Sequence, residues 1–139
     1  MKFSEITSEQ WEELKSYLDT CLLPVTGLNG TESPAETTQA LEDLRDVMDA
    51  IEIPFKGRVV TYPACHYIGE TEGHDTVERL CMALKRSGFR YVIVVSAKLR
   101  KLAPPSADLT FVPNHEGVNV DANAIGQAIR SLWAPPVNA

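Results

Sequence analysis

The chain has 139 residues, 44% of them hydrophobic and 23% charged, which is the composition of a globular protein able to bury its own core. The net charge of −6 argues against nucleic-acid binding, because contact with phosphates requires a basic surface. No segment is long and apolar enough to span a bilayer, so we expect no membrane partner.

Three cysteines lie in or beside apolar runs, at Cys21, Cys65 and Cys81. Their number is odd and no two have the C-x-x-C spacing, so we expect buried, reduced thiols. Reduced thiols are typical of the cytoplasm. The first residues contain no apolar segment of the kind found in signal peptides, and we therefore expect a cytoplasmic protein.

Capping patterns predict where four helices begin. Residues 7–10 (Thr-Ser-Glu-Gln) and residues 33–36 (Ser-Pro-Ala-Glu) both fit a capping box. Asp75 and Asp121 are acidic caps for two later helices, and Gly88 is a left-handed stop for the first of these. The apolar residues expected to face the core are Trp11, Leu14, Leu18, Leu41, Leu44, Val47 or Met48, Ile51, Val77, Leu80, Cys81, Leu84, Ile125, Ile129 and Leu132.

The clearest strand signal is the β-branched run within residues 88–96, which follows a glycine and is typical of a strand buried on both faces. Shorter strands are predicted at residues 21–25, 57–62 and 109–112. Pro24 cannot donate a ladder hydrogen bond, so the first strand is either an edge strand or leaves the sheet at this proline.

Helices and strands alternate along the chain, which favours parallel strands joined by right-handed crossovers. The predicted fold is an α/β, three-layer α/β/α sandwich of Rossmann-like type with a mainly parallel sheet of about four strands. We expect a single domain over residues 1–133 and a loose tail over residues 134–139, which contain two prolines.

Open α/β sheets bind ligands beyond the carboxyl ends of their strands, which here fall in four segments: residues 26–30, 63–74, 96–101 and 114–116. Polar and aromatic side chains in three of these segments are the candidates for ligand binding. They are His66, Tyr67, Glu70, Ser96, Lys98, Arg100 and Asn114.

All three histidines of the chain also fall in these segments. His66, His74 and His115, with Glu116, therefore form a candidate site for a divalent metal such as Zn or Mn, whose bound water would be activated for hydrolysis. No H-x-x-x-H or H-E-x-x-H spacing supports such a site, and loops carry polar residues in any case. We expect that no cofactor is needed, with a metal as the alternative.

Other catalytic arrangements have weaker support. Cys65 and His66 are adjacent, and neighbouring residues of an extended chain point to opposite sides. Ser96 lacks the G-x-S-x-G elbow of serine hydrolases, and no G-x-G-x-x-G or Walker A loop is present. Lys98, Arg100 and Lys101 form either an anion site or a solvated basic loop.

Residues 17–24 (YLDTCLLP) and 55–63 (FKGRVVTYP) resemble the YpiF-like family, short uncharacterised proteins of Gram-positive spore-forming bacteria. The resemblance also includes the helix and the strand that begins at Gly88, as well as the last strand. It therefore extends over most of the chain. It implies a cytoplasmic bacterial protein without an established activity.

A more distant similarity is to the creatininase amidohydrolases, metal-dependent α/β/α enzymes. Residues 22–27 look like their first strand, residues 67–74 look like their Y-G-x-S-x-E-H loop, and residues 88–95 look like the strand before their N-G-H-G-G-N signature. That resemblance carries over His74 and Glu72 as metal ligands. It implies a creatininase-like fold.

The metal ligands of the creatininases are otherwise missing from this chain. Their E-x-H-G ligands have no counterpart near residues 28–30, and Ser-Ala-Lys-Leu-Arg at residues 96–100 replaces the N-G-H-G-G-N signature. A fold without these ligands cannot run the metal-dependent mechanism. The resemblance therefore implies a shortened, inactive relative.

The absence of an assembled catalytic pattern favours a non-enzymatic module that binds a protein partner or a small ligand at the carboxyl edge of the sheet. The alternative is a metal-dependent amide hydrolase that uses His66, His74, His115 and Glu116. The acidic residues of the second helix and the basic residues 98–101 suggest a homo-oligomer in which these segments of two copies meet.

Overall fold

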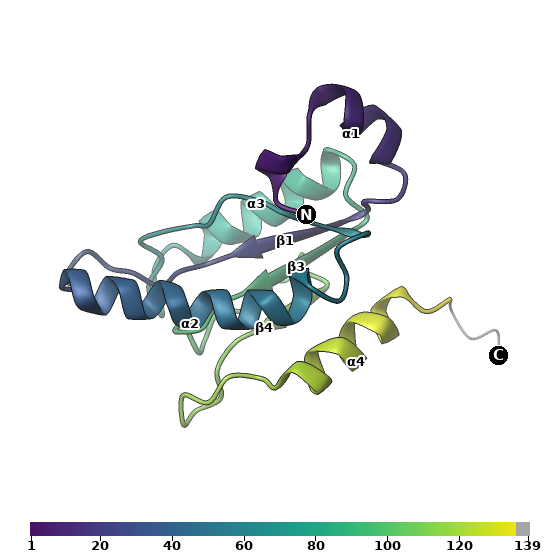
Figure 1. Cartoon of the computed structure of the whole chain (residues 1–139). Helices are drawn as coiled ribbons and strands as arrows, with labels where there is room; N and C mark the ends of the chain where they lie inside the picture. The colour runs from purple at the N-terminus through teal and green to yellow at the C-terminus, as the bar shows by residue number, and fades with distance from the viewer. Residues whose placement is uncertain (136–139) are drawn as a thin grey trace.

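The structure, a computed structural model, describes residues 1–135, so residues 136–139 of the predicted tail lie outside the described part. Its centre is a four-stranded parallel sheet with strand order β2-β1-β3-β4 (Figure 1). The four predicted strands are confirmed: β1 (Thr20–Pro24) is shifted by one residue from its predicted bounds, and β2 (Val59–Thr61), β3 (Tyr91–Val95) and β4 (Leu109–Phe111) are shorter than predicted.

Helices cover both faces of this sheet, which confirms the predicted three-layer arrangement (Figure 1). On one face lie α2 (Pro34–Glu52) and α4 (Ala122–Trp133). On the other lie α1 (Ser8–Leu14), preceded by a 3-10 helix (Phe3–Glu5), and α3 (His74–Arg86). Within residues 1–135, none of these helices combines the length and the apolar composition that crossing a membrane requires.

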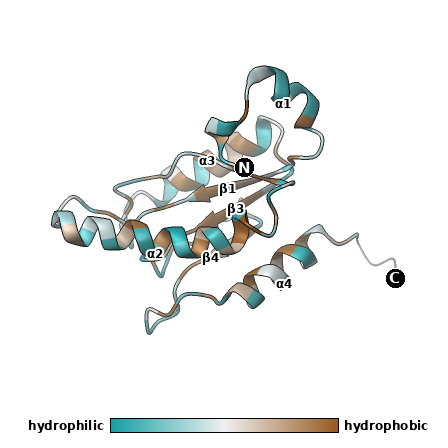
Figure 2. Ribbon diagram, in the orientation of Figure 1, coloured by the Kyte–Doolittle hydropathy of each residue, from teal (hydrophilic) through white to brown (hydrophobic). Residues whose placement is uncertain are grey.

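Strand β3 contributes side chains to the hydrophobic core on each face of the sheet, as expected for its β-branched run. Val92 and Val94 pack toward α1 and α3, whereas Ile93 and Val95 pack toward α2 and α4. All four side chains are fully buried. The hydrophobic colouring of the strands in Figure 2 follows from this arrangement, because alternate residues of a strand point to opposite faces.

Three of the four predicted helix starts are confirmed. Thr7 and Ser33 each complete a capping box, and the Asp121 side chain accepts a hydrogen bond from the third residue of α4. The fourth prediction is wrong, because α3 begins at His74 and its N-cap is Gly73 rather than Asp75. Asp75 lies in the first turn instead, where its charge still favours the helix dipole.

The predicted stop of α3 at Gly88 is confirmed. Gly88 has a φ of 122° and its N–H donates to the carbonyl of Lys85 at 3.2 Å. The N–H of Phe89 donates to the carbonyl of Leu84, also at 3.2 Å. This pair of bonds is a Schellman motif, which satisfies the last carbonyls of the helix.

Two leucines that were expected in the core are exposed instead. Leu41 of α2 is 43% exposed and Leu80 of α3 is 38% exposed. Both lie at the margin of their helix's apolar stripe, whose middle is taken by buried residues one turn away. Each leucine therefore presents an apolar side chain at the surface.

Pro24 does not mark an edge strand, because β1 lies between β2 and β3. The alternative prediction holds, since the strand ends at this proline. The carbonyl of Pro24 accepts a hydrogen bond from the N–H of Cys65 at 2.8 Å. In a parallel strand, the N–H and the carbonyl of one residue face the same neighbouring strand. The missing N–H of Pro24 therefore lies on the side of β2. Because β2 has already ended at Thr61, no ladder hydrogen bond is lost.

The outer edge of β2 is covered by the first residues of the chain. Lys2 forms a parallel bridge with Thr61, and the N–H of Thr61 donates to the carbonyl of Met1 at 2.8 Å. These contacts place the 3-10 helix beside the carboxyl end of β2.

Candidate ligand-binding site

All four strands point the same way, so the loops that follow them meet at one edge of the sheet, the carboxyl edge. The chain passes from β1 to β2 on one side and then to β3 on the other side of β1. The strand order therefore reverses between β1 and β3, and open α/β sheets usually bind their ligands at such a switch point. We call this place the β1/β3 crevice, and its neighbour on the other side of β1 the β1/β2 crevice.

The β1/β3 crevice is filled by the protein's own atoms. Gly27, with a φ of 73°, lies so close to the loop after β3 that an added Cβ would be 3.1 Å from Lys98 Cβ and 3.2 Å from Leu99 Cγ. Leu99 is only 3% exposed. The loops after β1 and β3 are thus in direct contact where a ligand would otherwise enter.

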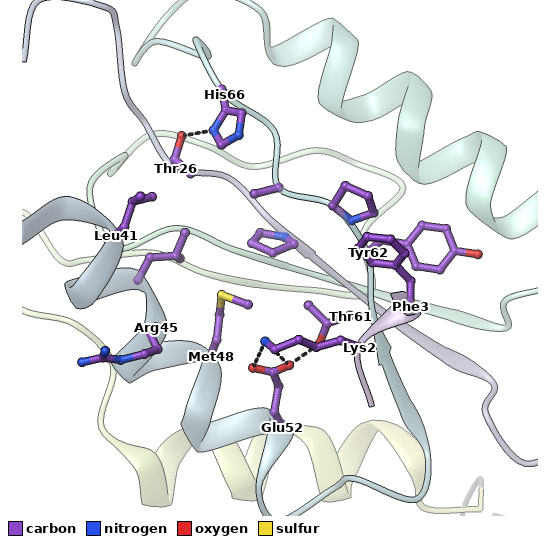
Figure 3. Close-up of a pocket in the computed structure, with 14 residues that line it drawn as sticks. Lys2, Phe3, Thr26, Leu41, Arg45, Met48, Glu52, Thr61, Tyr62 and His66 are labelled. Atoms are coloured by element: carbon purple, nitrogen blue, oxygen red, sulfur yellow. Dashed lines mark hydrogen bonds and ion pairs between the residues drawn. The ribbon is translucent and has the colours of Figure 1, made fainter. Parts of the chain in front are cut away.

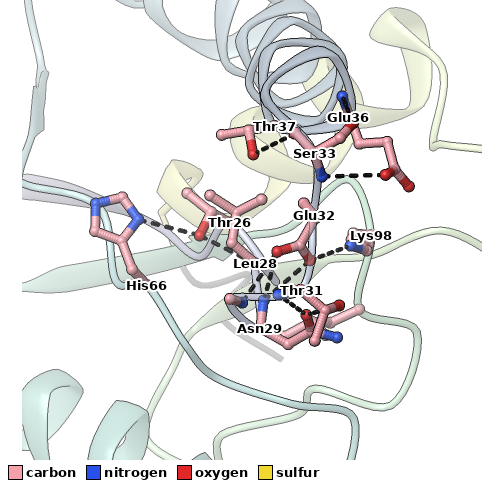
Figure 4. A network of polar contacts seen from close by, with 12 residues as sticks. Thr26, Leu28, Asn29, Thr31, Glu32, Ser33, Glu36, Thr37, His66 and Lys98 are labelled. Carbon is pink, nitrogen blue, oxygen red and sulfur yellow. Dashed lines mark hydrogen bonds and ion pairs between the residues drawn. The ribbon is translucent and has the colours of Figure 1, made fainter.

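The Glu32 carboxylate joins the same two loops (Figure 4). It accepts hydrogen bonds from the backbone N–H groups of Asn29 and Gly30, both at 3.0 Å. It also forms an ion pair with Lys98 Nζ at 2.9 Å. The Asn29 N–H first, and the Lys98 ammonium next, lower the pKa of Glu32 to about 2. A charged side chain of the protein itself therefore occupies the donors of this loop.

The β1/β2 crevice, in contrast, opens into a cavity of about 290 Å³ (Figure 3). The cavity lies between α2, the 3-10 helix and the carboxyl ends of β1 and β2. Its lining consists of Lys2, Phe3, Pro24, Thr26, Leu41, Leu44, Arg45, Met48, Glu52, Thr61, Tyr62, Pro63, Ala64 and His66.

Eight of the fourteen lining residues are apolar or aromatic, and the six polar or charged ones are mostly paired with one another. Glu52 accepts a hydrogen bond from the Thr61 hydroxyl at 2.8 Å and forms an ion pair with Lys2 at 3.2 Å (Figure 3). His66 Nδ1 lies 3.2 Å from the Thr26 hydroxyl. Arg45 is largely exposed, and its ion pair with the next residue is long, at 3.6 Å. The cavity thus combines apolar walls with an accessible guanidinium.

Residues 9–129 match the model of a family described as "Protein of unknown function (DUF2487)". The chain belongs to the DUF2487 family. Searches of curated proteins and of solved structures find no match for it. The part matched by the DUF2487 model contains both crevices and every cavity residue except Lys2 and Phe3.

The structure of this DUF2487 chain spreads the predicted ligand-binding residues over the carboxyl edge. His66 lines the cavity, and Tyr67, which is 71% exposed, lies beside His66. Ser96 is buried, and its hydroxyl accepts hydrogen bonds from the next loop, at 3.3 Å from the Lys98 N–H. Lys98 lies in the filled β1/β3 crevice. Of the seven candidates, one therefore lines the cavity and one is adjacent to it.

The remaining candidates hold the outer loops together. Glu70 accepts a hydrogen bond from the backbone N–H of Arg100 at 2.7 Å, and the Arg100 guanidinium donates to the carbonyl of His115 at 2.7 Å. The Asn114 side chain accepts from the N–H groups of Glu116 and Val118, at 2.9 and 3.0 Å. These contacts explain the local structure of the loops without a ligand.

The four predicted metal ligands are placed in different surroundings. His66 faces Thr26, and His74 Nε2 lies 2.7 Å from the carbonyl of Gly69. His115 and Glu116 are both strongly exposed and 3.7 Å apart. Among residues 1–135, no three His, Cys, Asp or Glu side chains are grouped as metal ligands would be. Binding of Zn or Mn by these residues stays a prediction.

Cys65 and His66 do not form a thiol–imidazole pair in the observed hydrogen bonding, since His66 Nδ1 faces the Thr26 hydroxyl. Burial raises the pKa of the Cys65 thiol, which keeps it protonated at neutral pH. The other two cysteines are buried and unpaired, and burial raises the pKa of Cys81 to about 11.

Sequence reasoning missed the wall of the cavity that α2 supplies. Leu41, Arg45, Met48 and Glu52 lie on one side of this helix at spacings of three or four residues, and all four line the cavity. The sequence contains a sign of this wall. Beside the buried stripe of the helix, the apolar Leu41 is followed along the same side by the charged Arg45 and Glu52. The helical pattern alone predicts core and solvent-exposed positions for these residues, not the wall of a site.

Proposed function

We propose that this protein is a non-enzymatic binding module whose β1/β2 cavity takes a small, largely apolar molecule. The observation that carries this proposal is the cavity itself, which lies at the carboxyl edge, exposes mostly apolar surface and has polar lining groups that are mostly paired with one another. The neighbouring β1/β3 crevice, the usual place for a ligand in this topology, is occupied by Glu32 and Leu99.

The charges around the cavity favour a ligand with an anionic group. Glu52 is already neutralised by Lys2 and hydrogen-bonded to Thr61, so it adds little negative charge. Arg45 has only an exposed, long contact with Asp46 and is available to an anion. An apolar body in the cavity and an anionic group at Arg45 would use both features.

We propose a cytoplasmic setting for this role. The three free thiols support it, as reduced cysteines are typical of that compartment. The resemblance to YpiF-like proteins of spore-forming bacteria supports the same setting.

The test uses 8-anilino-1-naphthalenesulfonate, an apolar fluorescent anion, as the probe. We expect it to bind the folded protein, and we expect Leu41→Glu to weaken binding at least tenfold, which corresponds to about 1.4 kcal/mol. The substitution removes part of the apolar wall and adds a negative charge there. Fluorescence titration measures the dissociation constant.

Leu80→Glu is the matched control. Leu80 is also a leucine at the margin of a helix and is similarly exposed, but it lies on α3, on the opposite face of the sheet. We expect it to change the affinity less than twofold. Equal loss in both variants, or no binding to the wild-type protein, would contradict the proposal.

A further inference from the structure

Tyr67 has an unusual backbone conformation. Within residues 1–135 it is the one residue other than glycine with a positive φ, at 62°. A bulky side chain in the left-handed region is a steric outlier, because its Cβ crowds the backbone. Folding therefore holds this residue in a conformation that costs free energy.

The neighbours of Tyr67 explain why the chain must turn there. Cys65 is fixed to the end of β1, since it donates to Pro24 and accepts from the N–H of Thr26 at 2.9 Å. Ile68 is buried in the core against Gly73. The chain must leave the sheet edge and enter the core within these few residues, and residue 67 takes the sharp turn.

The turn does not explain why the residue is tyrosine. Glycine or asparagine adopts a positive φ at lower cost. Tyr67 is 71% exposed, so folding buries little of its apolar surface. Neither the backbone nor the core therefore gains from this side chain, which points to a role at the surface.

The ring of Tyr67 lies beside the ring of His66, which lines the cavity. Its centroid is 6.1 Å from that of the His66 ring, with the two planes at 60°. An added Cβ on Gly30 would be 3.9 Å from Tyr67 Cε1, so the ring also lies against the loop after β1. His66 lines the cavity, so its ring connects the cavity wall to the exposed side chain of Tyr67.

We infer that Tyr67 is a ligand-contacting residue and that the ligand of the cavity carries a planar aromatic group, which packs against the Tyr67 and His66 rings. This inference rests on the proposed function. An exposed aromatic ring gives such a group a large contact area with two restricted torsions, and offset or edge-to-face packing adds to that contact.

The experiment compares Tyr67→Asn with Tyr67→Phe, using two sulfonates as probes. Asparagine removes the ring and tolerates a positive φ, whereas phenylalanine keeps the ring. We expect Tyr67→Asn to weaken binding of 8-anilino-1-naphthalenesulfonate at least fivefold, and Tyr67→Phe to change it less than twofold. Binding of the aliphatic octanesulfonate, measured by calorimetry, should change less than twofold in both. The melting temperature of Tyr67→Asn should equal or exceed that of the wild type.

Three outcomes would overturn the inference while leaving the proposed function intact, provided that Leu41→Glu still weakens binding of the aromatic probe. The first is unchanged affinity of Tyr67→Asn for that probe. The second is equal loss of affinity for both probes. The third is a marked fall in melting temperature, which would make the ring a packing residue. If Leu41→Glu has no effect, the proposed function itself is wrong.

Discussion

The two crevices at the carboxyl edge share the loop after β1 but differ in what fills them. In the β1/β3 crevice, Gly27 lets the loop approach Leu99, and Glu32 uses the free backbone donors. In the β1/β2 crevice, Phe3 and Leu41 are left half exposed around a cavity. Topology therefore selects the edge of the sheet, while the size and charge of a few side chains decide which crevice on that edge stays open.

The largest effect in this comparison should come from Gly27→Ala. The left-handed conformation costs a non-glycine residue about 1–2 kcal/mol, and the added Cβ crowds Lys98 and Leu99, which adds about 1–3 kcal/mol. We expect a loss of about 2–5 kcal/mol in the free energy of unfolding, measured with urea.

Two other glycines separate these contributions. Gly88 has a φ of 122° but no atom within 4 Å of an added Cβ, so Gly88→Ala should cost backbone strain alone, at least about 1–2 kcal/mol because this φ lies beyond the left-handed region that other residues reach. Gly57 has neither feature, and Gly57→Ala should stay within about 0.5 kcal/mol. If Gly27→Ala costs no more than the about 1–2 kcal/mol expected from backbone strain alone, the β1/β3 crevice is not closely packed.

A smaller, pH-dependent effect is expected from Glu32→Gln. The folded protein lowers the pKa of Glu32 from 4.5 to about 2, so the carboxylate stabilises the folded state above pH 4.5. This contribution is lost as the pH falls from 4.5 toward 2. The difference in melting temperature between wild type and Glu32→Gln should therefore be largest at neutral pH and shrink over this range.

The same variant tests whether the two crevices are independent. Glu32 does not line the cavity, so Glu32→Gln should change the affinity for 8-anilino-1-naphthalenesulfonate less than twofold at neutral pH. A clear change in affinity would show that the filled crevice controls the open one, contrary to the comparison above.

The smallest effect should come from divalent metals. His66, His74 and His115 lie in different surroundings, so we expect added Zn or Mn to leave the melting temperature unchanged within about 1 °C. A site saturated at 100 times its dissociation constant would add about 2.7 kcal/mol and raise it by several degrees. Such a rise, with one equivalent of bound metal, would favour the metal-dependent hydrolase instead.

The sequence predicted the fold well because its strongest signals are local. The β-branched run of β3 predicts a strand buried on both faces from its own residues alone. The capping boxes at Thr7 and Ser33 need only four residues each. The predicted cap at Asp75 is wrong because α3 begins after Gly73, which has a left-handed conformation and no side chain to form a cap. That conformation depends on how the preceding loop packs, which is not a local property.

The site was predicted only as an edge of the sheet, because its cavity joins residues that are far apart in the sequence. Phe3, Leu41 and Tyr62 come together through the pairing of the first residues with β2 and the packing of α2. His66 is the one predicted ligand-binding residue that lines the cavity, because the loop after β2 returns to the end of β1. Leu41 was assigned to the core because a helical period cannot distinguish a core residue from the wall of a cavity.

The pairing of Lys2 with Thr61 also has a consequence for self-association. Exposed sheet edges are templates for strand addition by other chains, and a lysine on an edge discourages such growth. In the described part of the chain, the β2 edge is already taken by Met1 and Lys2. A second copy that extended this sheet would therefore have to join at β4, on the far side from the cavity, and such a dimer would leave both cavities open to their ligands.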